Sequence, residues 1–152
     1  PHRKMMQGRR DEDEKMIRWA MEVTNILKYR DREVSRLSGG QRQRVWIAMA
    51  LAQNTKILFL DEPTTYLDIR YQIEILKLVK KLNQEYGITI IMVLHDMNQA
   101  IHFSDRIIGL KEGEVAVQGA PDEVITEECI RDLYGISLGV TTIEGKKFVL
   151  TV

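Results

Sequence analysis

Residues 56–63 read KILFLDEP, a short apolar run that ends in two acids and a proline. An apolar run of this length, without polar alternation, predicts a strand buried on both faces, as in a parallel sheet. A second run, ITIIMVL at 88–94, has the same character. Between the two, residues 68–87 place Ile, Leu and Val at helical spacing and stop at Gly87. The sequence therefore predicts an α/β fold with a largely parallel sheet.

The rest of the chain divides around these strands. Two helical patterns precede them, one over residues 11–27 with Asp11 as its expected N-cap, and one that begins after Gly40. After them come a short helix, two strands joined at a Glu-Gly turn, two short helices and a terminal hairpin with a second Glu-Gly turn. We expect a single domain with a helical part over residues 1–53 and an α/β part over residues 54–152.

Composition narrows the function classes. The formal net charge is zero because 22 basic residues balance 22 acidic ones, which does not favour a general nucleic-acid binder. Cys129 is the only cysteine, so an internal disulfide and a cysteine-based zinc site are excluded. The run at 88–94 is too short to span a membrane, and residues 1–15 lack the apolar core of a signal peptide. Those first residues, without an initiator methionine, read like the middle of a longer chain.

Two acids follow the first predicted strand. Asp61 and Glu62 come at its carboxyl end, where open α/β sheets bind their ligands. One carboxylate can hold Mg²⁺ directly or through water, and its neighbour can orient and polarise a water molecule. Phosphoryl hydrolysis needs both roles, since its catalysis is mostly positioning and charge stabilisation. The alternative interpretation is that these acids cap a strand and face solvent.

A histidine follows the second predicted strand in the same way. His95, with Asp96 beside it, could donate a hydrogen bond to a terminal phosphate and to the attacking water. Alone, a histidine at such a position more often lies at the surface or caps a helix. Two buried strands that both end in polar groups at one rim favour the functional interpretation. His2 and His102 have no such context and receive no role.

The stretch LSGGQ, residues 37–41, places a serine and two glycines directly before a helix. Glycine in a helix interior costs about 1 kcal/mol relative to alanine, so folding alone does not explain the pair. Amides at a helix N-terminus form an anion site, glycines let a phosphate approach closely, and Ser38 adds a hydroxyl donor. An ordinary Gly-rich turn is the alternative, which the combination with the two strand ends disfavours.

Together these motifs resemble those of the ATP-binding-cassette (ABC) ATPases over essentially the whole chain. Residues 37–41 look like the family's signature sequence, residues 57–62 like its Walker B strand, and residues 64–68 like its D-loop. The resemblance implies a partial P-loop NTPase (RecA-like) core with a parallel sheet, plus part of the ABC helical subdomain. It also implies ATP and Mg²⁺ as cofactors.

The resemblance gives each candidate residue a role. It implies that Asp61 supports magnesium, that Glu62 is the catalytic carboxylate and that His95 is the switch histidine. The residues implied to contact nucleotide are Ser38, Gly39, Gly40, Gln41 and Asp68.

One departure from the family pattern matters. The chain has no G-x-x-x-x-G-K-[ST] Walker A loop and no Q-loop glutamine, so it resembles the C-terminal portion of the subunit. In the family the signature acts on ATP held by the partner's Walker A. The implied partners are a second ATPase subunit in a head-to-tail dimer, membrane permease subunits and, indirectly, an extracytoplasmic substrate-binding protein, with no nucleic acid. The implied location is the cytoplasmic face of the cell membrane, as a peripheral protein.

Three functions follow from these patterns. Within the family, residues 1–15, 41–53, 62–70 and 93–100 look most like ATPase subunits of ferric-siderophore importers, with cobalamin and haem importers nearby. A DNA-repair ATPase with the same signature is one alternative, although such proteins carry long coiled-coil insertions and this chain has no sustained heptads. The other is a non-catalytic fragment, because the Walker A lysine is missing.

The resemblance also predicts an incomplete sheet. In similar proteins the Walker A strand lies between the strand at 88–94 and the strand at 106–110. We expect these two strands to have unpaired inner edges unless other residues, a partner chain or their own rearranged pairing fills the gap. We also expect the isolated chain to bind ATP more weakly than about 1 mM, which corresponds to about −4 kcal/mol.

Overall fold

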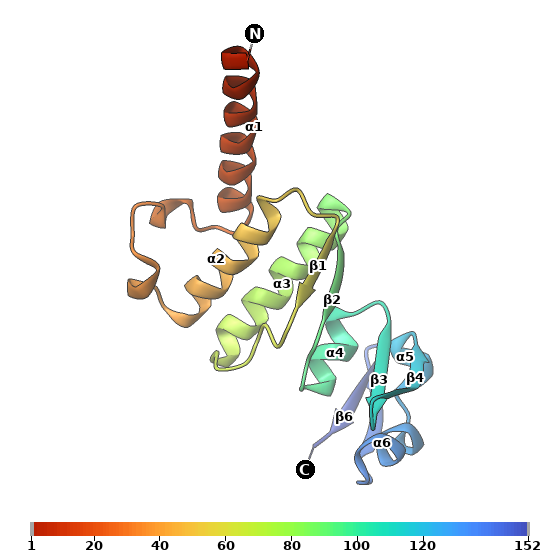
Figure 1. Cartoon of the computed structure of the whole chain (residues 1–152). Helices are drawn as coiled ribbons and strands as arrows, with labels where there is room; N and C mark the ends of the chain where they lie inside the picture. The colour runs from red at the N-terminus through yellow and green to blue at the C-terminus, as the bar shows by residue number, and fades with distance from the viewer. Residues whose placement is uncertain (1, 152) are drawn as a thin grey trace. The chain divides into compact units, whose positions relative to one another are not determined.

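The structure, a computed structural model, describes residues 2–151, with side-chain environments from Asp11 onward. The chain forms two compact units, one that ends at Val93 and one that begins at Leu94 (Figure 1). Each unit is described by itself below. Over residues 2–151, no helix has the length and apolar character needed to cross a membrane.

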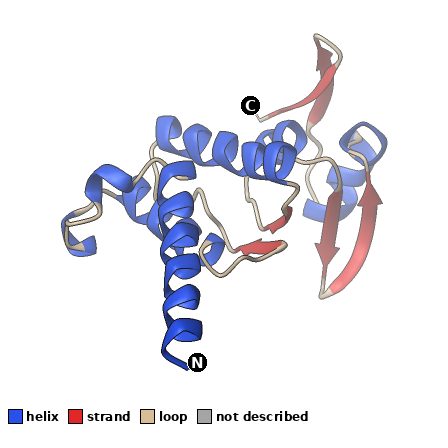
Figure 2. Ribbon diagram, turned by 90° about the horizontal axis from the view of Figure 1, so that it is seen from above, coloured by secondary structure: helices blue, strands red, loops and turns tan. Residues whose placement is uncertain are grey.

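The first unit is mainly helical and contains two short strands (Figures 1 and 2). The predicted start at Asp11 is wrong, because the first helix already begins at His2; the upstream Arg, Lys, Met and Gln residues are good helix formers and no proline interrupts them. In chain order the elements are α1 (His2–Val23), the 3-10 turns η1 (Leu27–Tyr29) and η2 (Val34–Arg36), α2 (Gly39–Leu51), β1 (Ile57–Leu60), α3 (Ile69–Tyr86) and β2 (Thr89–Met92).

The helix predicted between the two strands is confirmed. The Asp68 carboxylate caps the start of α3 by accepting a hydrogen bond from the Tyr71 amide. Gly87 ends it in the left-handed conformation with φ 65°, and the Gly87 amide donates to the Asn83 carbonyl at 3.0 Å.

The predicted parallel pairing is confirmed as well, but burial on both faces is not. Strands β1 and β2 pair in parallel from Ile57 opposite Thr89 to Leu60 opposite Met92. Leu58 is buried, whereas Phe59 is 72% exposed. Successive side chains of a strand point to opposite faces. The face of Leu58 packs into the α3 cluster, and the face of Phe59 lies open in the part of the chain that the structure describes.

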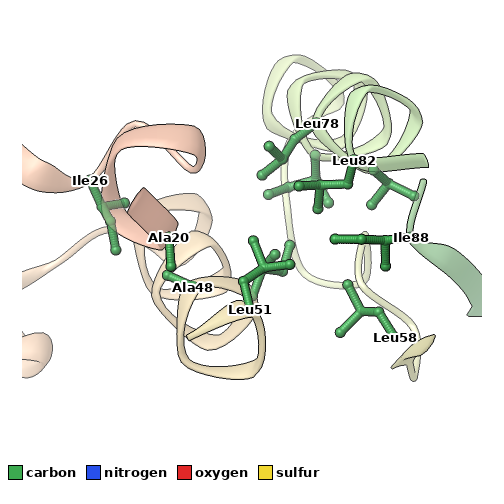
Figure 3. Close-up of a cluster of buried hydrophobic side chains, with 11 residues drawn as sticks. Ala20, Ile26, Ala48, Leu51, Leu58, Leu78, Leu82 and Ile88 are labelled. Carbon is green, nitrogen blue, oxygen red and sulfur yellow. The ribbon is translucent and has the colours of Figure 1, made fainter. Parts of the chain in front are cut away.

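The core of this unit lies between the three helices and one face of the sheet (Figure 3). Ala20 of α1 and Ala48 of α2 are small, which lets the two helices approach closely. Leu51 projects from α2 toward Leu82 of α3 and Leu58 of β1. Leu51 and Leu82 are at most 1% exposed, and full burial of each contributes about 2 kcal/mol.

The second unit is built from short elements around two hairpins. The predicted turns are both present, at Glu112-Gly113 and Glu144-Gly145, with positive φ at all four residues as a two-residue hairpin turn requires. The elements are α4 (Met97–Phe103), β3 (Ile107–Lys111), β4 (Glu114–Gly119), α5 (Pro121–Val124), α6 (Glu127–Tyr134), β5 (Gly139–Ile143) and β6 (Lys146–Leu150). Its buried core comprises Ile101, Val124, Ile125, Ile130 and Val149.

The predicted unpaired edges of β2 and β3 are present within residues 2–151. β2 pairs only with β1, and β3 pairs only with β4 in an antiparallel hairpin. The rearranged pairing of these two strands, one of the three ways to fill the gap, does not occur among the described residues. The division predicted at residue 53 between helical part and catalytic core stays a prediction.

Candidate functional site

The signature stretch, residues 37–41, begins helix α2 with a capping box. Ser38 caps α2: its Oγ accepts a hydrogen bond from the Gln41 amide at 3.3 Å, and the Ser38 amide donates to Gln41 Oε1 at 3.0 Å. The Gln41 Nε2 donates to the Tyr29 hydroxyl at 3.1 Å, which fixes the side chain further. The Gly39 and Gly40 amides lie in the first turn of α2, where helix amides have no intrahelical acceptor. Such a turn can present two amides to an anion.

The two glycines of this turn have different surroundings. A Cβ on Gly40 would lie 2.9 Å from Tyr71 Cδ1, so the buried Gly40 is required by close packing against α3. A Cβ on the exposed Gly39 would lie 3.2 Å from Leu67 Cδ2, the end of a flexible side chain. Sequence reasoning attributed both glycines to phosphate approach and missed the packing role of Gly40. These contacts bring the signature turn against the predicted D-loop.

The strand-end acids begin a second, conformationally strained turn. Asp61 is exposed directly after β1, and the partly buried Glu62 has φ 47°, which is uncommon for a residue other than glycine. Thr65 holds this position, because its Oγ1 donates to Glu62 Oε2 at 3.0 Å and its amide donates to the Glu62 carbonyl at 3.2 Å. Pro63 between them is fully buried. A left-handed residue of this kind costs about 1–3 kcal/mol and is typical of functional sites.

The rest of this turn is equally constrained. Tyr66 also has positive φ, at 62°, and its side chain is fully exposed. The Leu67 carbonyl accepts a hydrogen bond from Gln72 Nε2 at 2.8 Å. Asp68 Oδ1 accepts from the Tyr71 amide at 3.2 Å, so the structure uses this carboxylate to start α3. A nucleotide contact from Asp68 stays a prediction.

An ion-pair network that the sequence did not reveal links α2 to α3. Arg44 Nη2 lies 3.1 Å from Glu74 Oε2, and Arg44 Nη1 donates to the Thr24 carbonyl at 3.1 Å. Arg70 Nε contacts the other Glu74 oxygen at 3.1 Å. The Arg70 hydrogen bond lowers the pKa of Glu74 below its ordinary value, and Arg44 lowers it further against the opposing effect of partial burial. The Arg70–Glu74 pair has the i,i+4 spacing that a sequence can reveal, whereas Arg44 lies thirty residues away.

The second unit contains the remaining candidate. His95 is exposed, immediately before Asp96, whose carboxylate caps α4 by accepting from the Gln99 amide at 2.8 Å. Its approach to the strand-end acids stays a prediction. Cys129 is no candidate nucleophile, because burial, with help from the Asp132 charge, raises the pKa of its thiol and keeps it protonated.

The acids of the described residues do not form a metal cage. No group of three or more His, Cys, Asp or Glu side chains in residues 2–151 is placed to hold a metal ion. Magnesium commonly binds through one or two carboxylates, with waters and substrate phosphates as its other ligands. The exposed carboxylate of Asp61 at a strand end fits that pattern.

An apolar groove of about 320 Å³ lies on the helical side of the first unit. Its lining includes Met21 of α1 together with Val45 and Met49 of α2, and Arg30 and Arg32 also line it. Apart from Tyr29 and the two arginines, its lining residues are apolar.

Comparisons with known proteins agree with this geometry. The sequence model of the family described as ABC transporter matches residues 2–65. The chain is 49% identical over 148 residues to the petrobactin import ATP-binding protein FpuC of Bacillus anthracis, which covers 97% of this chain and 54% of FpuC. It is 50% identical over 136 residues to the ferric enterobactin transport ATP-binding protein FepC of Escherichia coli (strain K12), which covers 90% of this chain and 50% of FepC.

A solved structure confirms the predicted fold class. The chain matches cbiO1 of Clostridium perfringens, part of the ABC transporter complex cbiONQ, with a TM-score of 0.73 and 39% identity over 81% of this chain and 49% of that one. The chain spans about half the length of the curated relatives it matches. By sequence, by fold and by its signature and strand-end motifs, the chain is similar to the ATP-binding proteins of ABC transporters, and the ABC transporter family model matches its residues 2–65.

Proposed function

We propose that this chain serves in the ATP-hydrolysing subunit of an ABC importer that takes up iron–siderophore complexes through a membrane permease. The observation that carries the proposal is that two motifs lie together in one unit. The helix start that Ser38 caps packs against Leu67, in the turn that follows Glu62, and against Tyr71 of α3. The names of FpuC and FepC, which specify petrobactin and ferric enterobactin, support a siderophore rather than cobalamin or haem.

Each candidate residue has a role in this proposal. Asp61 supports magnesium, and Glu62 orients and polarises the water that attacks the terminal phosphate. His95 donates a hydrogen bond to that phosphate. Ser38 and the amides of Gly39 and Gly40 bind phosphate oxygens of a nucleotide held by a second subunit.

Two residues that were predicted to contact nucleotide, Gln41 and Asp68, form hydrogen bonds within the chain itself. The hydrogen bonds of Gln41 hold the signature turn in shape, and those of Asp68 start α3. We propose that both act on nucleotide through the turns that they hold.

The partners follow from the same proposal. A second copy of the subunit closes head to tail, so that each signature turn faces the nucleotide of the other. The apolar groove beside Met21 and Met49 is the surface we assign to the permease, on the cytoplasmic face of the membrane. A substrate-binding protein outside the cell delivers the cargo indirectly.

The isolated chain is a separate case. Its 152 residues contain no G-x-x-x-x-G-K-[ST] stretch, which is the observation that favours the non-catalytic alternative for this polypeptide by itself. A test of the proposed function therefore needs this sequence within a full-length ATPase subunit.

The experiment replaces the matched 148 residues of FpuC with this sequence and measures ATP hydrolysis by the purified chimera. Glu62→Gln should retain ATP binding and accumulate a closed dimer, while turnover falls at least about 100-fold, because a positioned base contributes that much or more. Asp61→Asn should instead weaken the magnesium dependence of nucleotide binding.

The matched control is Glu85→Gln, which changes an exposed glutamate near the end of α3 and should leave turnover unchanged. Near-normal hydrolysis by Glu62→Gln would remove Glu62 from the role. A folded chimera with no hydrolysis at all would contradict the proposed function.

A further inference from the structure

The segment that connects α1 to α2 contains one tyrosine that anchors it. This segment loops outward from the two helices (Figure 1), and neither of its 3-10 turns, η1 and η2, contains a buried residue. Over residues 28–36 the Tyr29 side chain is half-buried and every other residue is exposed. Tyr29 packs against the core cluster of the first unit, so it fixes where this part of the segment lies.

Several contacts hold the Tyr29 ring in place. The Tyr29 amide donates to the Ile26 carbonyl at 2.8 Å, and the Tyr29 carbonyl accepts from the Arg32 amide at 2.9 Å. The Lys28 ammonium lies 5.1 Å from the centre of the ring, and the guanidinium carbon of Arg32 lies 5.3 Å from it. Cations at such distances are attracted to the face of an aromatic ring. The position of the Tyr29 hydroxyl is therefore set by contacts outside the signature turn.

This hydroxyl reaches the side chain that completes the capping box of α2. It accepts a hydrogen bond from Gln41 Nε2 at 3.1 Å, across twelve residues of sequence. The oxygen of the same amide group, Gln41 Oε1, accepts from the Ser38 amide at 3.0 Å. Tyr29 and Ser38 therefore hold both polar ends of the Gln41 side chain. The bond to Tyr29 is partly buried, which strengthens it relative to a bond in open water.

The capping box determines which groups of the turn face an anion. Ser38 Oγ accepts from the Gln41 amide at 3.3 Å, so its hydroxyl hydrogen is directed away from that amide. The amides of Gly39 and Gly40 lie beside it in the first turn, where they have no intrahelical acceptor. If the Gln41 side chain rotated away, the Ser38 amide would lose its acceptor and the box would loosen.

We propose that Tyr29 is a positioning residue for the signature turn: its hydroxyl holds Gln41 in the capping box and so keeps Ser38 and the glycine amides in the arrangement that binds a phosphate. The inference rests on the proposed function and adds to it a residue from outside the signature stretch. Tyr29 acts through Gln41 and contacts no nucleotide itself. Loss of its hydroxyl should therefore impair dimer closure and hydrolysis, which need the signature turn, and leave ATP binding by one subunit unchanged.

The experiment compares Tyr29→Phe with the unaltered sequence in the FpuC chimera. Phenylalanine retains the ring, its packing and both cation contacts, and it removes only the hydroxyl. Turnover at saturating ATP should fall about 3- to 10-fold, the effect of one lost hydrogen bond, while the ATP affinity of the monomer changes by less than about 2-fold. Tyr134→Phe is the matched control, because it removes the hydroxyl of an exposed tyrosine in the second unit and should change neither quantity.

A double-mutant cycle tests whether Tyr29 acts through Gln41. Gln41→Ala should lower turnover at least as much as Tyr29→Phe does, and the double variant should lose no more than Gln41→Ala alone. Losses that multiply would show two independent roles and would overturn the proposal. Urea unfolding of each variant establishes that it is folded.

Hydrogen exchange of the chimera without nucleotide gives a second test, which does not involve hydrolysis. Exchange at the Ser38 amide should be about 3- to 10-fold faster in Tyr29→Phe, since its acceptor on Gln41 is held less firmly, and unchanged in Tyr134→Phe. Unchanged exchange at Ser38 would overturn the proposal, as would unchanged turnover in an active chimera. An inactive chimera of unaltered sequence would contradict the proposed function instead, and the exchange measurement would then decide the role of Tyr29 by itself.

Discussion

The two turns that carry the candidate site are built in opposite ways. The signature turn is unstrained: neither glycine has positive φ, and Ser38 and Gln41 satisfy each other's amides. The acid turn contains two left-handed residues, Glu62 and Tyr66, and hydrogen bonds from Thr65 hold Glu62. The difference shows that one turn forms without any left-handed residue, while the other holds a carboxylate-bearing residue in a backbone conformation that is uncommon outside glycine.

The largest expected effect tests the anion role of the first turn. Gly39→Asp in the FpuC chimera would place a carboxylate beside a bound phosphate, with both repulsion and desolvation opposing it. Turnover and dimer closure should fall at least about 100-fold, a loss of about 2.7 kcal/mol, while ATP binding to the monomer changes little. The measurement compares steady-state hydrolysis with nucleotide affinity, and intact turnover would contradict the phosphate role of the signature turn.

The next prediction tests close packing. Gly40→Ala places a methyl group 2.9 Å from the Tyr71 ring, and the overpacking should destabilise the chain by about 1–3 kcal/mol in urea unfolding. Gly39→Ala is the matched control and should cost less, because it meets only the flexible end of Leu67 at 3.2 Å. Equal costs for the two would show that the Tyr71 contact is not what requires glycine.

Strain in the acid turn has its own test. Tyr66→Gly should stabilise the chain by up to about 1 kcal/mol, because glycine adopts φ 62° without the cost of a Cβ and the exposed ring gives up no burial. The same substitution at exposed Tyr134, inside α6, should destabilise and serves as the control. Destabilisation by Tyr66→Gly would show that the ring has a structural contact.

The smallest effect concerns the ion pairs of Glu74, which link α2 to α3. Because the pKa of Glu74 is lowered in the folded chain, its charge stabilises the fold at pH values above 4.5 and this contribution is lost as the pH falls toward the lowered value. Glu74→Gln should therefore cost about 0.5 kcal/mol near neutral pH, allowing for solvent screening, and nothing at the acid end. A pH-independent cost in urea unfolding would exclude the charge as the cause.

The sequence predicted the features that depend on neighbouring residues. The stop at Gly87 and both Glu-Gly turns are local, and all are present, whereas the cap at Asp68 was not predicted. Features that depend on distant contacts were missed: Gly40 packs against Tyr71 and Arg44 pairs with Glu74, and spacing along the chain reveals neither. Burial on both faces of β1 was predicted from its apolar composition, and it is wrong for the face of Phe59. Apolar composition shows that a strand can be buried on both faces, but it does not show which other residues cover each face.

The unequal surroundings of the two signature glycines bear on how such a chain changes over generations. Selection on Gly40 acts through folding, since any side chain there meets Tyr71, whereas under the proposed function selection on Gly39 acts through the binding of phosphate. A descendant that kept the fold but abandoned ATP would therefore retain Gly40 and accumulate substitutions at Gly39. The pair would then record, in adjacent positions, whether a lineage still hydrolyses nucleotide.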